Sequence, residues 1–294
     1  MSWQEVLLQQ LINGLTIGMI YALIALGYTM VYGIIQLINF AHGEVFMVGA
    51  YLGLTVLLLF HQPVFVFIAA LAGTALLGFF IERFGYRPLR DAPRLAPLIT
   101  AIGISFVLQN AVMLIYGPFD KSFPSLFSIK KFSWHNVTVT NLQILIYIVS
   151  ILLMLGLHLF IQKTKTGKAM RALADDRPTA SLMGINVNRI ISLTFVVGSA
   201  LAGIGGVLFG VYYSTINFHD GYLAGLKAFT AAVLGGIGNI PGAMVGGVLL
   251  GLLEGLGAGY LSSEWKNVFA FVILILLLLF KPSGLLGERV VKKV

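Results

Sequence analysis

The sequence predicts an all-α protein that crosses a membrane several times, and two features of its composition lead to this prediction. Of its 294 residues, 58% are hydrophobic and only 10% are charged, whereas soluble domains carry about 25% charged residues. The apolar residues stand in long runs, such as 145–161 and 268–280, and not in the alternation of a half-buried strand or helix. So few charges cannot cover a water-facing surface, which excludes an ordinary soluble enzyme.

The hydrophobic segments are long enough for membrane-spanning helices, each of which needs roughly 20 apolar residues. Short connections separate most of these segments, so residues 1–294 are expected to form a single transmembrane domain. We assign about eight hydrophobic segments by their apolar runs, at 7–34, 43–60, 64–81, 97–117, 142–161, 190–213, 227–257 and 267–280.

The Lys and Arg residues are distributed very unevenly among the connections. The first 82 residues contain none, and most of the 19 stand in the connections 82–97 and 163–189 and in the tail after residue 280. Connections rich in Lys and Arg stay in the cytoplasm, so these three stretches are predicted to be cytoplasmic. The net charge of +8 therefore reflects membrane topology and not binding to nucleic acid. Five lysines are assigned to the outer side: Lys121, Lys130, Lys131, Lys227 and Lys266.

The segment 227–257 is expected to contain a reversal of the chain. An even number of crossings must separate the two basic stretches on either side of it, so this segment should begin and end on the outer side. Residues 235–242, Gly-Gly-Ile-Gly-Asn-Ile-Pro-Gly, cannot continue a helix, because proline lacks an N–H donor and the glycines weaken the backbone. We expect two half-helices in a re-entrant hairpin, or two short crossings.

A similar interruption occurs in the first half of the chain, at residues 38–44, Ile-Asn-Phe-Ala-His-Gly-Glu. Both interruptions place Asn and Gly before a helix that begins with small residues. Paired broken helices in two halves suggest an internal repeat and a transport pathway. The first interruption and the later one are therefore candidates to line that pathway.

Glycine recurs at every fourth position in several segments, which brings small residues onto one helix face. Such faces let helices approach closely inside a membrane. Packing within one bundle is favoured over a dedicated dimer interface. The series are Gly14, Gly18 and Ala22; Gly198, Ala202, Gly206 and Gly210; and Gly247, Gly251, Gly255 and Gly259.

Few side chains inside the predicted spans could carry chemistry. Glu44 and Glu254 are the carboxylates there, and each is read either as paired with a backbone group or interfacial water, or as part of a functional site. Cysteine is absent and the five histidines are scattered, so no metal site is expected. Gly167-Lys168 is followed by Ala169 and does not complete a phosphate-binding loop. No catalytic residues and no cofactor are therefore expected.

The basic connection 163–189 is the most informative segment outside the membrane. Its composition favours short helices around 167–174 and 178–183, the second capped by Asp176 and ended by Gly184. A short helix that exposes apolar residues among polar neighbours suits a groove on a partner protein. An amphipathic connector on the lipid surface is the alternative. The apolar residues in question are Ala180, Leu182 and Met183.

Several stretches together are similar to the LivH-type permeases, the membrane subunits of bacterial branched-chain amino-acid ABC importers. They are Asn13–Gly27 and Ile38–Gly43 in the first half, then Gly167–Ala172 (Gly-Lys-Ala-Met-Arg-Ala), Leu182–Asn186 (Leu-Met-Gly-Ile-Asn), and 235–247 with its six glycines. The resemblance covers most of the chain. It implies a type II-like importer architecture, a bacterial inner-membrane location and a cargo of leucine, isoleucine and valine.

The same resemblance implies partners: a second, LivM-type permease, two cytoplasmic ATPases, and a periplasmic or extracellular substrate-binding protein. The connection 163–189 then corresponds to the element that docks on an ATPase, although it lacks the Glu-Ala-Ala triplet and the later Ile-x-Leu-Pro of the commoner importer pattern. The candidate coupling residues are Asp175, Asp176, Arg177, Ala180, Leu182, Met183 and Gly184. The candidate substrate-path residues are Asn39, His42, Glu44, Gly238, Asn239 and Gly242.

Two alternative functions remain open from the sequence. A relative in the same family could carry urea or another small amide, because selection rests largely with the binding protein. A stand-alone secondary transporter would instead need an ion-coupling site, for which Glu44 and Glu254 are the candidates.

Overall fold

The computed structural model describes residues 3–93, 95–134 and 136–287. Within this part of the chain, seven helices are long and apolar enough to cross a membrane, which confirms the all-α, multi-pass prediction. The shorter α9 (Asp220–Gly235) and α11 (Lys266–Phe280) complete the bundle. Two further helices, α6 (Lys165–Asp175) and α7 (Arg177–Leu182), connect α5 to α8 outside it. The seven are α1 (Trp3–Ile35), α2 (His42–Phe60), α3 (Pro63–Phe80, continued to Leu89), α4 (Leu95–Tyr116), α5 (Asn141–Lys163), α8 (Val187–Tyr213) and α10 (Ile240–Tyr260).

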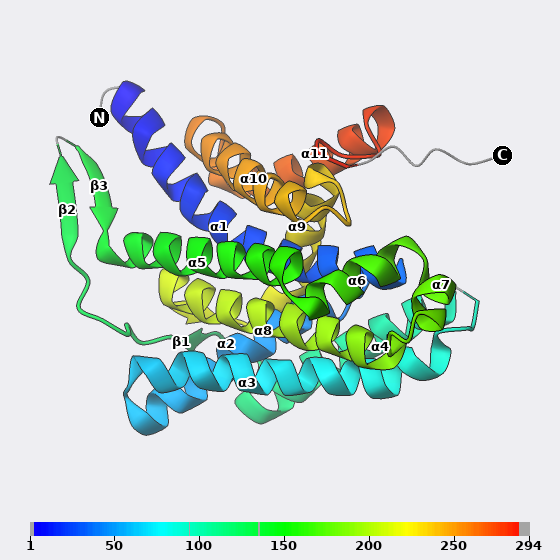
Figure 1. Cartoon of the computed structure of the whole chain (residues 1–294). Coiled ribbons are helices and arrows are strands. Elements are labelled where there is room, and N and C mark those ends of the chain that lie inside the picture. The colour runs from blue at the N-terminus through cyan, green and yellow to red at the C-terminus, as the bar shows by residue number, and fades with distance from the viewer. Residues whose placement is uncertain (1–2, 94, 135, 288–294) are drawn as a thin grey trace.

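The strands are confined to the connections. β1 (Lys121–Ser122) pairs antiparallel with β4 (Thr215–Ile216). β2 (Lys131–Trp134) and β3 (Val137–Thr140) form a hairpin in which Lys131 lies opposite Thr140. Both small sheets lie at the end of the bundle that holds the N-terminus of α1 (Figure 1).

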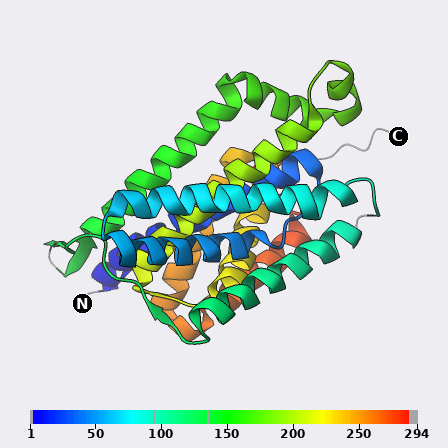
Figure 2. The same cartoon turned by 90° about the horizontal axis from the view of Figure 1, so that it is seen from below.

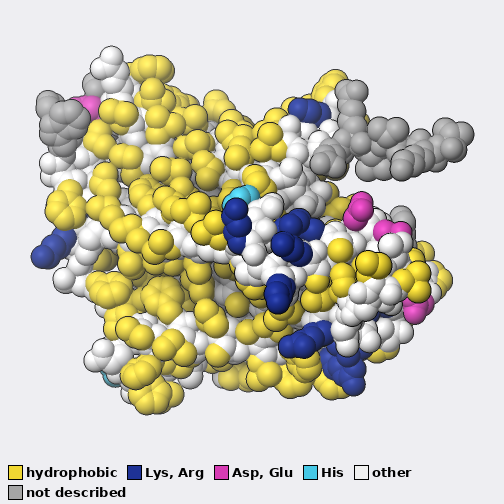
Figure 3. All heavy atoms as spheres, viewed as in Figure 1, with side chains coloured by type: hydrophobic (Ala, Val, Ile, Leu, Met, Phe, Trp, Pro, Cys, Tyr) yellow, Lys and Arg dark blue, Asp and Glu magenta, His cyan; other side chains and the backbone are white. Residues whose placement is uncertain are grey.

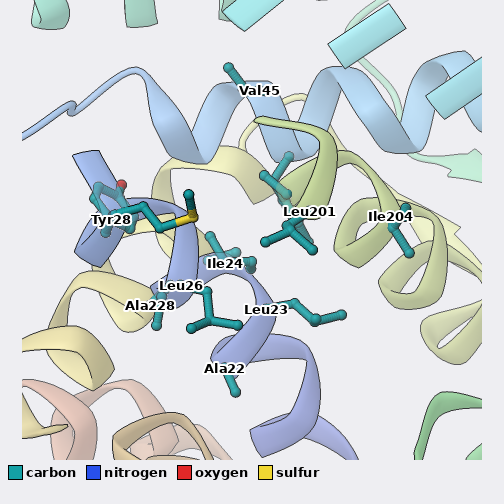
Figure 4. Packing of buried hydrophobic residues seen from close by; sticks show 14 of the residues in the cluster. Ala22, Leu23, Ile24, Leu26, Tyr28, Val45, Leu201, Ile204 and Ala228 are labelled. Atoms are coloured by element: carbon teal, nitrogen blue, oxygen red, sulfur yellow. The ribbon is translucent and has the colours of Figure 1, made fainter. Parts of the chain in front are cut away.

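Helices α1 and α8 form the centre of the bundle, and α4 lies at its edge. In the most apolar stretch of α1 and of α8, 78% of the residues are buried inside the protein, against 11% in α4. Figure 4 shows Leu23, Ile24 and Leu26 of α1 lying between Leu201 of α8 and Ala228 of α9. Figure 2 shows α4 crossing the outside of the bundle, so its apolar side chains are available to lipid or to another subunit.

The periodic glycines bring helix backbones into contact, as expected from the sequence. A Cβ atom at Gly18 of α1 would lie 2.9 Å from the Cα of Val248 in α10, and one at Gly14 would lie 2.9 Å from the Cα of Leu252. A Cβ at Gly251 of α10 would overlap the backbone of Gly18 in turn. Because lipid provides no hydrophobic driving force between helices, this close packing holds α1 against α10.

One end of the bundle gathers the basic connections that we predict to be cytoplasmic. Arg90, after α3, donates to the side chain of Asn188 at the start of α8 (2.7 Å). Arg177 of α7 reaches the carbonyl of Ile34 near the end of α1 (3.4 Å). On the face shown in Figure 3, most Lys and Arg side chains cluster toward this end, and hydrophobic side chains cover the rest. The predicted cytoplasmic tail is described only as far as residue 287, so Arg289, Lys292 and Lys293 lie outside the described residues.

The predicted reversal within 227–257 is present. Helix α9 ends at Gly235, and α10 begins at Ile240 after Gly236 (φ +106°) and Gly238 (φ +95°), which adopt a backbone conformation that only glycine takes easily. The turn lies at the basic end, because the backbone N–H of Leu285 donates to the carbonyl of Leu234 (2.9 Å). Helices α9 and α10 therefore form a hairpin that starts and finishes at the opposite, outer end. Helix α10, however, has 21 residues and is long enough for a full crossing, unlike the half-helix that we expect from the sequence.

The assignment of Lys227 to an outer connection is wrong. Helix α9 begins at Asp220, earlier than the sequence suggests, and it carries Lys227 into the interior, where the residue is 5% exposed. The physical reason is an ion pair with Glu254 of α10, which offsets much of the cost of burying the ammonium group.

Candidate functional site

The predicted break in the first half lies between α1 and α2, at residues 36–41. The side chain of Asn39 accepts hydrogen bonds from the backbone N–H of Ala41 (3.1 Å) and from the Tyr86 hydroxyl (3.3 Å). The carbonyl of the same Asn39 accepts from the backbone N–H of His42, the first residue of α2 (3.0 Å). Asn39 thus fixes the turn that starts α2 in the interior.

His42 and Glu44 are buried in the first turn of α2, and each is 1% exposed. The His42 ring meets the Tyr28 ring edge-on at 4.8 Å between centroids, and its Nε2 has no hydrogen-bond partner in the structure. Glu44 Oε1 accepts from the Ser105 hydroxyl (3.2 Å), while Oε2 has no hydrogen-bond partner among the described residues and lies against Gly221 of α9. The positive end of the α2 dipole favours a carboxylate at this position.

A mostly apolar cavity of about 300 Å³ lies next to Glu44, between α1, α4 and α9. Ser105 and Gly221, which contact the Glu44 carboxylate, are part of its wall. The structure therefore places Glu44 against a cavity that could admit a small apolar molecule, whereas Asn39 and His42 are not part of the wall of this cavity.

The other three candidate path residues lie apart, in the turn between α9 and α10. Asn239 caps α10, with its Oδ1 accepting from the backbone N–H of Gly242 (2.9 Å), and its Nδ2 donates to the carbonyl of Leu286 (2.8 Å). Gly242 packs against the carbonyl of Gly235, and Gly238 is exposed near Gly33 of α1. Asn239 and Gly242 have clear structural roles here, and the structure does not bring them to His42 or Glu44.

We expect the substitution Asn239→Ala to lower the free energy of unfolding by about 1 kcal/mol, because α10 loses its N-cap. Chemical unfolding of the detergent-solubilised protein measures this change. Asn110→Ala is the matched control, since the Asn110 side chain is exposed and donates only to the carbonyl of Phe106 in its own helix. Equal stability of the two variants would contradict the capping role.

The sequence did not reveal that Lys227 and Glu254 form an ion pair. Lys227 Nζ lies 2.8 Å from Glu254 Oε1, and the Tyr21 hydroxyl donates to Glu254 Oε2 (3.0 Å). The three residues come from α9, α10 and α1, so the pair connects the reversal to the central helix. The sequence feature that could have placed Lys227 inside a helix is the apolar sequence on both sides of it, which is unusual for a connection between helices.

A third buried carboxylate, Glu82, was not predicted from the sequence. It lies in the π-helical continuation of α3 (Ile81–Tyr86), is fully buried, and pairs with Arg87 (2.7 Å) and Arg90 (2.8 Å). The Ser192 hydroxyl of α8 donates to the same carboxylate. This cluster anchors the basic end of α3 to α8. The sequence feature that could have indicated it is one Glu followed by two Arg residues within eight positions.

The basic connection contains the two short helices that the sequence predicts, as α6 and α7. Asp176 caps α7 by accepting from the backbone N–H of Thr179 (3.2 Å), and hydrogen bonds from the Thr179 hydroxyl and this N–H lower the pKa of the Asp176 carboxyl. Gly184 (φ +83°) ends the segment. Asp175 is exposed, whereas Arg177 turns toward the end of α1.

The tip of α7 exposes two of the three predicted apolar residues. Leu182 is 88% exposed and Met183 is 79% exposed. The expectation that Ala180 is exposed is wrong, since it is 5% exposed and its small side chain faces the protein. The adjacent apolar pair Leu182–Met183 is therefore the part of this connection that is free to contact a partner.

A comparison with known families and relatives adds to this geometry. A family described as the permease component of the branched-chain amino acid transport system matches residues 10–278. The chain belongs to this family. Together with the seven apolar helices, this membership makes the permease a multi-pass protein of the bacterial inner membrane.

The permease is similar over almost its whole length to two bacterial proteins. It is 52% identical to the high-affinity branched-chain amino acid transport system permease protein BraD of Pseudomonas aeruginosa, over 98% of both chains. It is 49% identical to the permease protein LivH of the corresponding system in Escherichia coli, over 98% of this chain and 97% of LivH. A weaker similarity, 26% identity over 97% of this chain and 72% of the relative, links it to LivM of Escherichia coli.

Proposed function

We propose that this permease is the membrane-spanning subunit of an ATP-driven importer for branched-chain amino acids. The identity of about half of all residues with BraD and LivH across nearly the full length carries the proposal. The chain itself would need no cofactor and would catalyse no reaction, because partner ATPases would hydrolyse the ATP. Residues 1–294 would act as one transmembrane domain.

The partners in this proposal are a second, LivM-type permease, two cytoplasmic ATPases and an external substrate-binding protein. The similarity to LivM, 26% identity over 97% of this chain and 72% of LivM, supports a second permease of related fold. The exposed pair Leu182–Met183 supports docking on an ATPase, since apolar side chains at a helix tip suit a groove on a partner. The candidate path of Asn39, His42 and Glu44 would contact the cargo at the break between α1 and α2.

Purification of the subunit in mild detergent from its native membrane tests the assembly, and reconstitution of the purified complex into liposomes tests transport. We expect a second permease and ATPases to purify with the subunit. When the binding protein is added to these liposomes, we also expect ATP-dependent uptake of leucine, and not of urea, that persists when proton and sodium gradients are collapsed. Uptake by the isolated chain that stops with those gradients would contradict the proposal and favour an ion-coupled transporter.

We expect Met183→Glu to abolish most ATP-driven uptake while the subunit remains inserted in the membrane. A buried carboxylate would oppose docking of the α7 tip in an apolar groove, and truncation or disruption of such a central contact costs about 2 kcal/mol or more. Leucine uptake and ATPase activity of the reconstituted complex are the measurements. Lys131→Glu, at an exposed position of the outer hairpin, is the matched control. Wild-type uptake in the Met183 variant would show that the α7 tip is not part of the coupling contact.

A further inference from the structure

A second cavity, of about 230 Å³, opens on the other side of α9, toward the outer end of the bundle. Its walls come from α1, α8, α9 and α11, through residues such as Tyr21, Tyr213, Asp220, Lys227 and Lys266. The position is outer because α9 begins there and because α11 starts beside the end of α10, opposite the basic end. Unlike the cavity beside Glu44, it has charged side chains of both signs in its wall.

The two lysines in the wall of this cavity have N–H groups that no described residue accepts. Lys227 donates to Glu254 Oε1 (2.8 Å) and has no other hydrogen-bond partner among the described residues, although an ammonium group has three N–H donors. Its Nζ also lies 5.7 Å from the centroid of the Tyr21 ring. Lys266 forms no ion pair with any residue that the structure describes, and its Nζ lies 5.9 Å from the centroid of the Tyr213 ring. Both lysines line the cavity, so unused N–H groups are available there.

The cavity also has an acceptor without a partner. Asp220, at the start of α9, uses one carboxylate oxygen to accept from the backbone N–H of Asn217 (2.7 Å). The other oxygen has no partner in the described part of the chain. Leu223 and Ala224 add an apolar wall on the same helix.

The wall of the cavity carries charges of both signs, because Lys227 and Lys266 stand in the same wall as Asp220, while Glu254, outside that wall, pairs with Lys227. A simple anion would gain from the lysines but would be repelled by Asp220. A molecule that carries one positive and one negative charge next to an apolar group would meet an anionic, a cationic and an apolar part of this wall at the same time.

We infer that this cavity binds a free α-amino acid on the outer side of the membrane. The α-carboxylate lies toward Lys227 and Lys266, the α-ammonium lies toward Asp220, and the apolar side chain packs on Leu223 and Ala224. The inference rests on the proposed function, since it names the place where the cargo is first held by this subunit. It also supplies a reason for an amino-acid cargo over urea, which has neither charge.

Photolabelling tests the site directly. The assembled importer, in lipid nanodiscs and without the binding protein, is illuminated with a diazirine analogue of leucine, and the labelled peptides are mapped by mass spectrometry. We expect labelling of the α9 peptide that contains Leu223 and Ala224. Excess leucine should remove this label, whereas 4-methylpentanoate, which lacks the ammonium, and 3-methylbutylamine, which lacks the carboxylate, should not.

Two cavity variants and one control sharpen the test. Lys266→Gln and Asp220→Asn should each reduce labelling at a sub-saturating probe concentration about tenfold, which corresponds to about 1.4 kcal/mol. Both positions are only half-buried, so the fold should tolerate these nearly isosteric changes. Lys131→Gln, at an exposed lysine of β2 on the same outer side, should label like the wild type.

The inference is overturned if the α9 label resists excess leucine, if either single-charge analogue competes as well as leucine, or if both cavity variants label like the wild type. Leucine uptake by the same complex with its binding protein is measured in parallel. A complex that imports leucine without labelling α9 overturns the site alone. A complex that labels α9 but imports no leucine overturns the proposed function and leaves the site in place.

Discussion

Replacement of Lys227 by methionine is expected to destabilise the protein strongly, by about 3–5 kcal/mol, because it leaves a buried carboxylate without its cation. Lys227 and Glu254 have side chains that are 6% and 2% exposed, and their Nζ and Oε1 atoms are 2.8 Å apart. The surrounding helices offer Glu254 only the Tyr21 hydroxyl in place of the ammonium. The yield of monodisperse protein after heating in detergent, followed by chemical unfolding, measures the loss.

The double variant Lys227→Met, Glu254→Gln separates loss of the pair from loss of packing. A neutral glutamine still accepts from the Tyr21 hydroxyl and needs no cation, so most of the lost stability should return. Breaking a buried pair is far more costly than replacing both members. A double variant as unstable as Lys227→Met alone would show that the methionine disrupts packing and that the ion pair contributes little.

The close contact between α1 and α10 predicts a second large effect. Gly251→Ala should lower the free energy of unfolding by about 1–3 kcal/mol or more. The added methyl group has no space, so the backbones of α1 and α10 must separate. The nearest neighbours of a Cβ at this position are all backbone atoms, of Gly18 and Gly14, which cannot rotate away as a side chain can.

Gly156→Ala in α5 is the matched control. A Cβ at Gly156 has nothing within 4 Å, so this change should be neutral or should stabilise the protein by about 0.4–1 kcal/mol. Thermal unfolding of both variants in the same detergent measures the difference. Similar stability of the two would mean that α1 and α10 are not held by backbone contact.

Local chemistry made much of the fold predictable from the sequence. The glycines spaced by four predicted close helix packing, and the run Gly-Gly-Ile-Gly-Asn-Ile-Pro-Gly predicted the turn between α9 and α10, because both signals depend on neighbouring residues. Asp176 and Gly184 likewise marked the ends of α7. Such features need no knowledge of distant contacts.

The sequence was less informative where a residue depends on a distant partner. Lys227 looked like part of a connection because its counterion stands 27 residues later, on another helix. The contact between the Asn239 side chain and the carbonyl of Leu286 was not predictable either, because only the fold brings these two residues together. Ala180 is buried because the chain folds back at the end of α7, and a short helix gives no periodic signal for that.

The length of α8 has a mechanical consequence. Its 27 residues correspond to a straight rod of roughly 40 Å, which starts just after the Leu182–Met183 tip and ends at Tyr213 in the wall of the outer cavity. Between these ends Gly198 rests against Gly27 of α1, with no side chains between the two backbones. Gly203 and Gly206 likewise bring α8 against the backbones of α3 and α2. Helix α8 is therefore held at several points along its length, and a displacement of its basic end reaches the outer cavity only if those neighbouring helices move with it.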